Sequence, residues 1–183
     1  MRQEFVQEVK NLITNNINTI HTVFPGEIVS FDTSTGLAVI LPTMKYKKPN
    51  GETIDYPQVT GVPVVFPQSY NQQATIAYPI KAGDGCLVLA AEESIDYWMY
   101  GQETNTDLHY DMTNSIAIVG LFNTVNAVLT EACNENAVIV DVNGTRIKVT
   151  DGKVQIDAAE VEINGDVTIN GSLTTQGGTV NLN

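Results

Sequence analysis

The sequence predicts a mainly β protein with a short N-terminal amphipathic helix, a small antiparallel barrel and a C-terminal rod in which three chains intertwine. Three observations lead to this fold class. Apolar residues recur at helical spacing over residues 2–20. Short apolar runs bounded by turn residues follow as far as residue 122. From Ala137 onward, apolar residues with one residue between them recur at a nearly constant period, which is typical of a solenoid.

Residues 1–24 are predicted to form the amphipathic helix and its lead-in. Its apolar face has two open interpretations: it packs against the barrel of its own chain, or it docks on a neighbouring subunit. The residues at helical spacing are Phe5, Val9, Leu12, Ile13, Ile17 and Ile20.

Residues 25–122 are predicted to form a small antiparallel barrel. Five or six short strands in this length suit an OB-fold, a barrel whose near closure hides its strand edges. A connector follows at residues 123–136, in which Val125–Ala132 is either a strand or a helical turn. The expected strands are Glu27–Phe31, Leu37–Leu41, Val62–Phe66, Thr75–Tyr78, Gly85–Ala91 and Ser115–Val119.

Residues 137–183 contain the repeat, with Asn-Gly and Asp-Gly steps that are typical of tight turns between short strands. Each strand has only two or three apolar side chains, so one chain cannot enclose a core. Three chains wound around one axis would bring these side chains together, which predicts an intertwined triple-stranded β-helix, a homotrimer. The expected core residues are Val140, Val142, Ile147, Val149, Val154, Ile156, Val161, Ile163, Val167 and Ile169.

The composition of the chain argues against several classes of function. The formal net charge is -12 and the pI is near 4.3, a balance that repels phosphate backbones and argues against nucleic acid as a partner. No apolar run approaches the roughly 20 residues that span a bilayer. Glu4, Glu8 and Lys10 interrupt the N-terminal apolar residues, so we expect no secretion signal and assembly in a cytoplasm. Cys86 and Cys133 are too few for a disulfide framework.

Several polar clusters have a catalytic and a structural interpretation, and the structural one is favoured for each. Gly83–Gly85 is typical of a β-turn, since neither a helix signal nor a Lys-Ser/Thr pair follows it. His109 and Asp111 could belong to a catalytic triad, but the sequence contains no nucleophile motif that would complete it. The carboxylates at residues 92–96 fall in a loop rather than on opposite walls of a cleft. We therefore expect no enzymatic activity, no cofactor and no metal ligand.

Blocks of the barrel region resemble the central baseplate spike, or membrane-piercing protein, of contractile-tailed bacteriophages. The resemblance covers about residues 20–122 and continues as the repeat. It implies an OB-fold followed by a trimeric β-helix in the virion, with the baseplate hub and the host cell envelope as partners. The blocks are Pro25–Asp32, Gly61–Pro67, Tyr78–Leu89, Glu92–Trp98 and Asn114–Leu121.

The chain departs from that family at its tip. Several such spikes end in a His-x-His pair that holds iron, whereas this chain has only His21 and His109. We therefore expect either a blunt tip or a separate cap protein in contact with Val180 and Leu182.

One alternative belongs to a different functional class. Tyr97, Trp98 and Tyr100 could form an aromatic platform in a trimeric OB-fold module that binds cell-wall carbohydrate. A buried Trp98 would count against this alternative.

Overall fold

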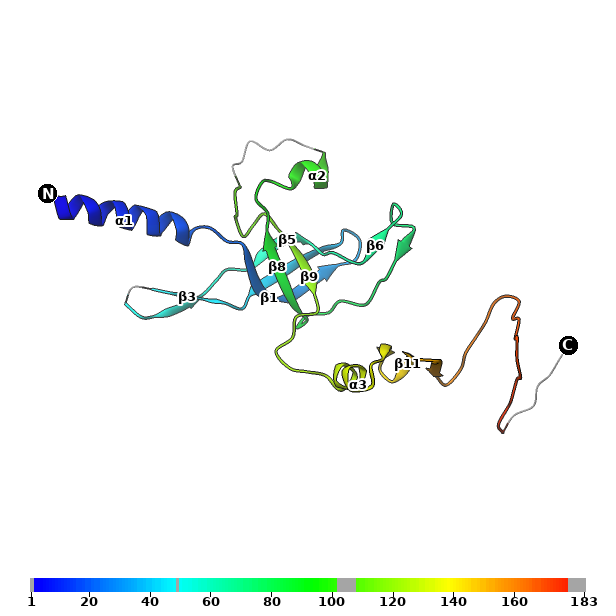
Figure 1. Ribbon diagram of the computed structural model, residues 1–183. Helices are drawn as coiled ribbons and strands as arrows, with labels where there is room; N and C mark the ends of the chain where they lie inside the picture. The colour runs from blue at the N-terminus through cyan, green and yellow to red at the C-terminus, as the bar shows by residue number, and fades with distance from the viewer. Residues whose placement is uncertain (1, 49, 102–107, 178–183) are drawn as a thin grey trace. The chain divides into compact units, whose positions relative to one another are not determined.

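The computed structural model describes residues 2–48, 50–101 and 108–177. The chain divides into two compact units, residues 1–124 and 125–183, which are described separately (Figure 1). The predicted mainly β fold with a short N-terminal helix is confirmed.

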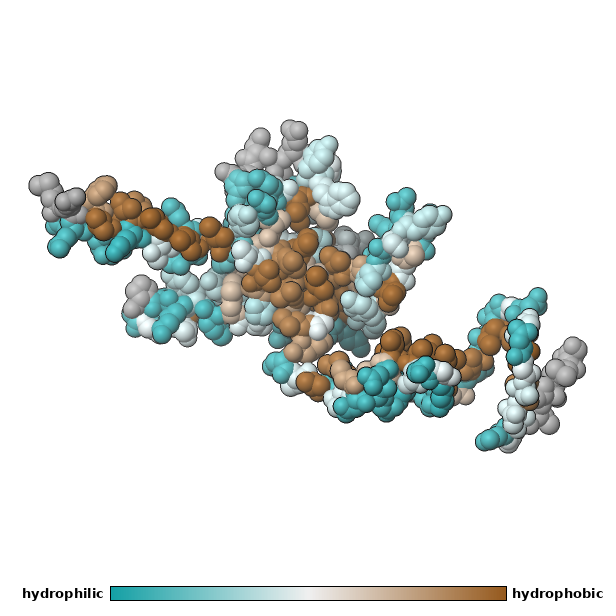
Figure 2. All heavy atoms as spheres, in the orientation of Figure 1, coloured by the Kyte–Doolittle hydropathy of each residue, from teal (hydrophilic) through white to brown (hydrophobic). Residues whose placement is uncertain are grey.

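Helix α1 spans Arg2–Asn18, where the apolar periodicity predicts it. Its apolar side chains are exposed: Phe5 by 65%, Leu12 by 62% and Ile17 by 61%. The interpretation in which this face packs on the chain's own barrel is therefore wrong for the single chain. In Figure 2, hydrophobic residues form a continuous row along α1.

Five strands make the central sheet, in the order β5-β2-β1-β8-β9. Strand β1 is the longest of the described strands and lies between β2 and β8, and a bulge between Ile28 and Ser30 shifts its register with β2. Val64 and Ala117 form a parallel bridge that brings the two sheet edges together. The sheet is thus a half-barrel. Its strands are β1 (Val23–Asp32), β2 (Leu37–Pro42), β5 (Val59–Pro63), β8 (Gly85–Ala90) and β9 (Ser115–Val119).

The inward side chains of this sheet form the core. Burial alternates along β1 and β2, as expected for strands with one face on the core. Cys86 is fully buried, and burial raises the pKa of its thiol to about 11, so it behaves as a small apolar side chain. The largest fully buried apolar residues are Ile28, Ile40, Val62, Val88 and Cys86.

Smaller elements project from the half-barrel. Strands β3 (Lys45–Lys47) and β4 (Thr53–Asp55) form one ribbon, and β6 (Gln68–Ser69) and β7 (Ala74–Thr75) form another. The barrel strand predicted at Thr75–Tyr78 is wrong, because only β7 is a strand there and it pairs with β6. Helix α2 (Asp96–Tyr100) lies between β8 and β9.

The second unit begins with helix α3 (Ala127–Glu135). The Asn126 side chain caps it by accepting a hydrogen bond from the Leu129 N–H at 2.7 Å. Asn136 ends it in the left-handed conformation. The connector, for which strand and helix were both open, is therefore helical.

Strands β10 (Val138–Val142), β11 (Thr145–Thr150) and β12 (Lys153–Asp157) form an antiparallel meander. The first turn is Asn143-Gly144 with φ of 55° and 91°, as the Asn-Gly step predicts. Pairing within the chain satisfies both edges of β11, whereas β10 and β12 each keep one edge without a strand partner among the described residues. From Ala158 to Gly177 the described chain forms no regular strand.

Candidate functional site

The meander has one face made of apolar side chains, here called the apolar face. Directly paired residues lie on the same side of a sheet, and the register places Val138, Val149 and Val154 in one row. A second row contains Val140, Ile147 and Ile156. The apolar face consists of Val138, Val140, Val142, Ile147, Val149, Val154 and Ile156.

Every residue of the apolar face is exposed in the single chain, from 41% for Val149 to 69% for Val138. Figure 2 shows hydrophobic residues gathered over this part of the second unit. A contiguous apolar surface of this kind marks an interaction site in a soluble protein.

The opposite face of the meander is polar and is held by α3. Glu131 accepts hydrogen bonds from Arg146 Nη2 at 2.7 Å and from Lys148 Nζ at 2.6 Å. Glu135 accepts a second bond from Lys148 at 2.6 Å. Asp141 Oδ2 lies 3.6 Å from Arg146 Nε. The four side chains Glu131, Arg146, Lys148 and Asp141 are at most 28% exposed, whereas Glu135 is 51% exposed, so the network is partly shielded from solvent.

The network changes the protonation equilibria of its members. Hydrogen bonds from Lys148 and Arg146 lower the pKa of the Glu131 carboxyl. The same bonds from Glu131 raise the pKa of Lys148 and of Arg146. All three groups are therefore held in their charged forms near neutral pH.

The two faces of the meander are thus unequal. A sheet normally buries its apolar face and exposes its polar face. Here the polar face is occupied by α3, and the apolar face remains exposed, with Ala158, Glu160 and Val161 lining a hollow beside part of it. Removal of these apolar side chains from water would be favourable.

The ten expected core residues fall into two groups. Six of them lie on the apolar face: Val140, Val142, Ile147, Val149, Val154 and Ile156. The other four, Val161, Ile163, Val167 and Ile169, lie in the irregular segment and are 52–64% exposed. The expected cap contacts, Val180 and Leu182, lie outside the described residues.

Sequence reasoning missed two features of this surface. Val138 belongs to the apolar face, and its place in the same alternation was a usable signal. The ion network was also missed, although Glu131 and Glu135 are one helical turn apart and Arg146 and Lys148 alternate along a strand.

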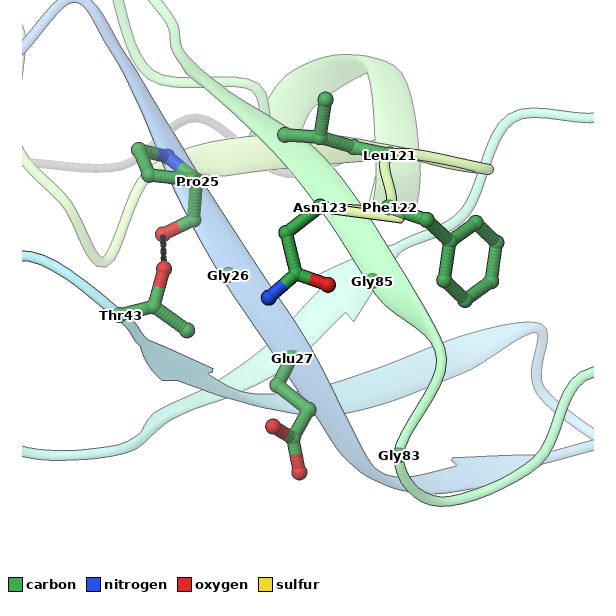
Figure 3. A pocket seen from close by; sticks show the side chains of 9 residues that line it. All are labelled: Pro25, Gly26, Glu27, Thr43, Gly83, Gly85, Leu121, Phe122 and Asn123. Atoms are coloured by element: carbon green, nitrogen blue, oxygen red, sulfur yellow. Dashed lines mark hydrogen bonds between the residues drawn. The ribbon is translucent and has the colours of Figure 1, made fainter. Parts of the chain in front are cut away.

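A separate hollow lies in the first unit, where the chain leaves the half-barrel (Figure 3). The amide N–H groups of Gly120 and Leu121 donate to the Gly85 carbonyl oxygen at 2.9 and 3.2 Å. Thr43 Oγ1 donates to the Pro25 carbonyl oxygen at 3.2 Å on the other side. Three of the nine lining residues are glycines, and the contacts with Gly85 hold the exit segment against the half-barrel. Its lining residues are Pro25, Gly26, Glu27, Thr43, Gly83, Gly85, Leu121, Phe122 and Asn123.

The aromatic residues of α2 form a third exposed feature. Tyr97 is 67%, Trp98 88% and Tyr100 57% exposed. The buried side chain of Asn114 holds the start of this helix, because its Oδ1 accepts from the Ile95 N–H at 3.0 Å. Its Nδ2 donates to the carbonyl oxygens of residues 93 and 108 at 2.7 and 3.0 Å.

The described residues contain no group of three or more His, Cys, Asp or Glu side chains placed to hold a metal ion. None of the helices in the described ranges is long and apolar enough to cross a membrane.

The family model of the phage protein Gp138 N-terminal domain matches residues 24–120, which is more than half of the chain. The chain belongs to this family. It is accordingly a phage structural protein associated with the virion, and the matched residues contain all five strands of the half-barrel except Val23, the first residue of β1. Among curated proteins, no match was found.

Proposed function

We propose that this phage protein is the central spike of a contractile tail, a homotrimer that leads the tail tube through the cell envelope. The observation that carries the proposal is the unequal meander, with its polar face held by α3 and its apolar face uncovered. Three copies of the chain would bury three apolar faces against one another around an axis, with each α3 on the outside.

The remaining repeat extends this arrangement. Val161, Ile163, Val167 and Ile169 are exposed, and their segment has no strand partner within the described chain. Three such segments would pair with one another as an intertwined β-helix. Each apolar side chain that becomes buried contributes about 1.5–3 kcal/mol before the entropy of ordering is subtracted. That contribution supports a stiff needle.

The other parts take supporting roles in this proposal. The half-barrel, as an OB-fold collar, attaches the spike to the baseplate hub of the tail. The net charge of -12 per chain keeps the needle soluble after assembly in the host cytoplasm. The spike acts mechanically, without an enzymatic step or a cofactor. A small cap protein contacts Val180 and Leu182 at the tip.

The trimer is tested by the mass of the full-length protein in solution. Three copies of the 19.9 kDa chain predict about 60 kDa by sedimentation equilibrium. A single-chain mass at micromolar concentration would contradict the proposal.

The role is tested in phage particles whose spike gene is truncated after Asn136. The half-barrel is retained in this variant, so particles should still assemble and adsorb. Without a needle, we expect them to contract without delivering DNA. Wild-type infectivity of such particles would show that the needle does not lead penetration.

One observation favours a second function, a trimeric OB-fold module that binds cell-wall carbohydrate. Trp98 is 88% exposed, and an exposed aromatic ring can stack on a sugar. This alternative predicts that Trp98→Ala abolishes sedimentation of the protein with purified cell walls. Phe122→Ala is the matched control, since Phe122 is an exposed aromatic residue at another place. Equal sedimentation of both variants with the wild type, or none by any of them, would reject this function.

A further inference from the structure

The apolar face of α1 is an exposed apolar feature that the proposed needle does not use. Within the helix, Phe5, Val6, Val9, Leu12, Ile13 and Ile17 are 36–65% exposed. At 3.6 residues per turn, these six cover an arc of roughly 140° of the helix surface. A helix of this length is marginal in water without a partner, so its order requires cover on that arc.

We propose that α1 is covered by the α1 helices of the other two copies of this chain, as a parallel three-helix bundle at the base of the spike. This inference rests on the proposed homotrimer, in which three copies of α1 belong to one particle. Tethering within one particle makes their association intramolecular, and weak helix pairing is then sufficient.

Charge favours copies of the same helix as the occupant. The whole chain carries -12, whereas Arg2, Glu4, Glu8 and Lys10 cancel within α1. Three α1 helices therefore approach without the repulsion that three acidic surfaces would have.

The positions of these charges point to the same arrangement. On the helical wheel, Lys10 borders one edge of the apolar arc, beside Ile17. Glu8 borders the other edge, beside Leu12. In a ring of parallel helices, one edge of each helix faces the opposite edge of the next, so Lys10 of one copy faces Glu8 of its neighbour.

The width of the arc and the two polar positions on it are also informative. A two-stranded coiled coil uses a narrow seam, whereas an arc of roughly 140° leaves apolar residues exposed in a dimer and covers them in a larger bundle. On the helical wheel, position 2 (Arg2) falls within the arc at the first residue of the helix, and Asn16 falls within it between the directions of Phe5 and Val9. A polar residue at one core position specifies the register of such a bundle.

Disulfide trapping in the full-length protein tests this bundle. Cys133 is exposed and is first replaced by serine, while Cys86 is buried and stays. Val9→Cys then places a thiol at the middle of the arc, and Gln7→Cys places one on the opposite side as a control. We expect Val9→Cys to oxidise to a covalent dimer in up to two of every three chains, within particles of trimer mass. Gln7→Cys should remain uncrosslinked.

The outcomes separate this inference from the proposed function. A trimer in which Val9→Cys crosslinks no faster than Gln7→Cys overturns the bundle and leaves the needle intact; α1 then serves another partner, such as a hub protein. A single-chain mass overturns both proposals, because α1 then has no copy beside it.

A second pair of variants avoids cysteine chemistry. Ile13→Glu places a carboxylate within the arc, and Thr14→Glu places one on the polar side of the same helical turn. The proposal predicts that Ile13→Glu loses most of the α1 contribution to far-ultraviolet circular dichroism, while the trimer mass persists through the needle. Equal spectra for the two variants would overturn the bundle.

Discussion

The carbonyl oxygen of Leu121 lies so close to Gly85 that a β-carbon on residue 85 would be 1.7 Å from it. The same two residues are joined by the Leu121 N–H···O=C Gly85 hydrogen bond of 3.2 Å. The exit segment of the half-barrel therefore lies directly on the Gly85 backbone. This contact determines where the chain leaves the family domain.

Gly85→Ala should consequently displace the exit segment. The methyl group cannot fit without breaking the hydrogen bonds from Gly120 and Leu121, and such overpacking costs about 1–3 kcal/mol or more. We expect a lower melting temperature by differential scanning calorimetry. Glu27→Ala is the control, since Glu27 lines the same hollow and is exposed. Equal melting temperatures of the two variants would show that the exit segment moves aside without destabilising the fold.

The apolar face predicts a contrast between neighbouring residues of β12. Ile156 lies on the apolar face and Gln155 on the other. In the proposed trimer, Ile156→Asp places three carboxylates near one axis, where an unpaired charge strongly resists burial. We expect Ile156→Asp to sediment as single chains and Gln155→Asp to remain a trimer. If Ile156→Asp keeps the trimer mass and melting temperature, the apolar face does not form the trimer core.

Glu131 predicts a pH dependence. Its pKa is lowered in the folded state by hydrogen bonds from Lys148 and Arg146. A lowered carboxyl pKa stabilises the fold above the ordinary value of 4.5, and this stabilisation is lost as the pH falls below it towards the folded value. Glu131→Gln should therefore lower the melting temperature at neutral pH and narrow its gap to wild type under acidic conditions.

The matched control for this prediction is Glu52→Gln. Glu52 forms an ion pair with Lys48 in an exposed ribbon, where such pairs contribute little. A melting difference between Glu131→Gln and wild type that stays constant from neutral to acidic pH would contradict an ionic role for Glu131.

The strands of the half-barrel were predictable where alternation and turns agree. Gly85–Ala91 and Ser115–Val119 match β8 and β9 to within one residue. The prediction of a barrel strand at Thr75–Tyr78 was wrong, because the alternating apolar residues there do not face the core. Ile76 is 68% exposed, and its N–H donates to the Pro67 carbonyl oxygen as part of a ribbon outside the barrel.

The candidate site was predictable in its residues but not in its pairing. Alternation identifies Val140 and Ile147 as members of one face, but it does not say which strand lies beside which. In the structure, tight turns place β10 beside β11 and β11 beside β12. Helix α3 is too short for its periodicity to distinguish it from a strand. That it packs on the polar face of the meander is therefore known only from the structure, through the contacts of Glu131.

Asn114 provides the last prediction, because it joins three parts of the loop that presents α2. Its side chain is 2% exposed and forms three hydrogen bonds to the backbone around residues 93–108. Asn114→Ala removes these bonds and leaves buried backbone groups unpaired, at a cost of about 1–3 kcal/mol. We expect faster amide hydrogen exchange at Ile95 and around α2, with β1 and β2 still protected. Gln58→Ala, at an exposed amide side chain, should exchange like the wild type. Unchanged exchange at Ile95 in Asn114→Ala would show that other contacts hold the loop.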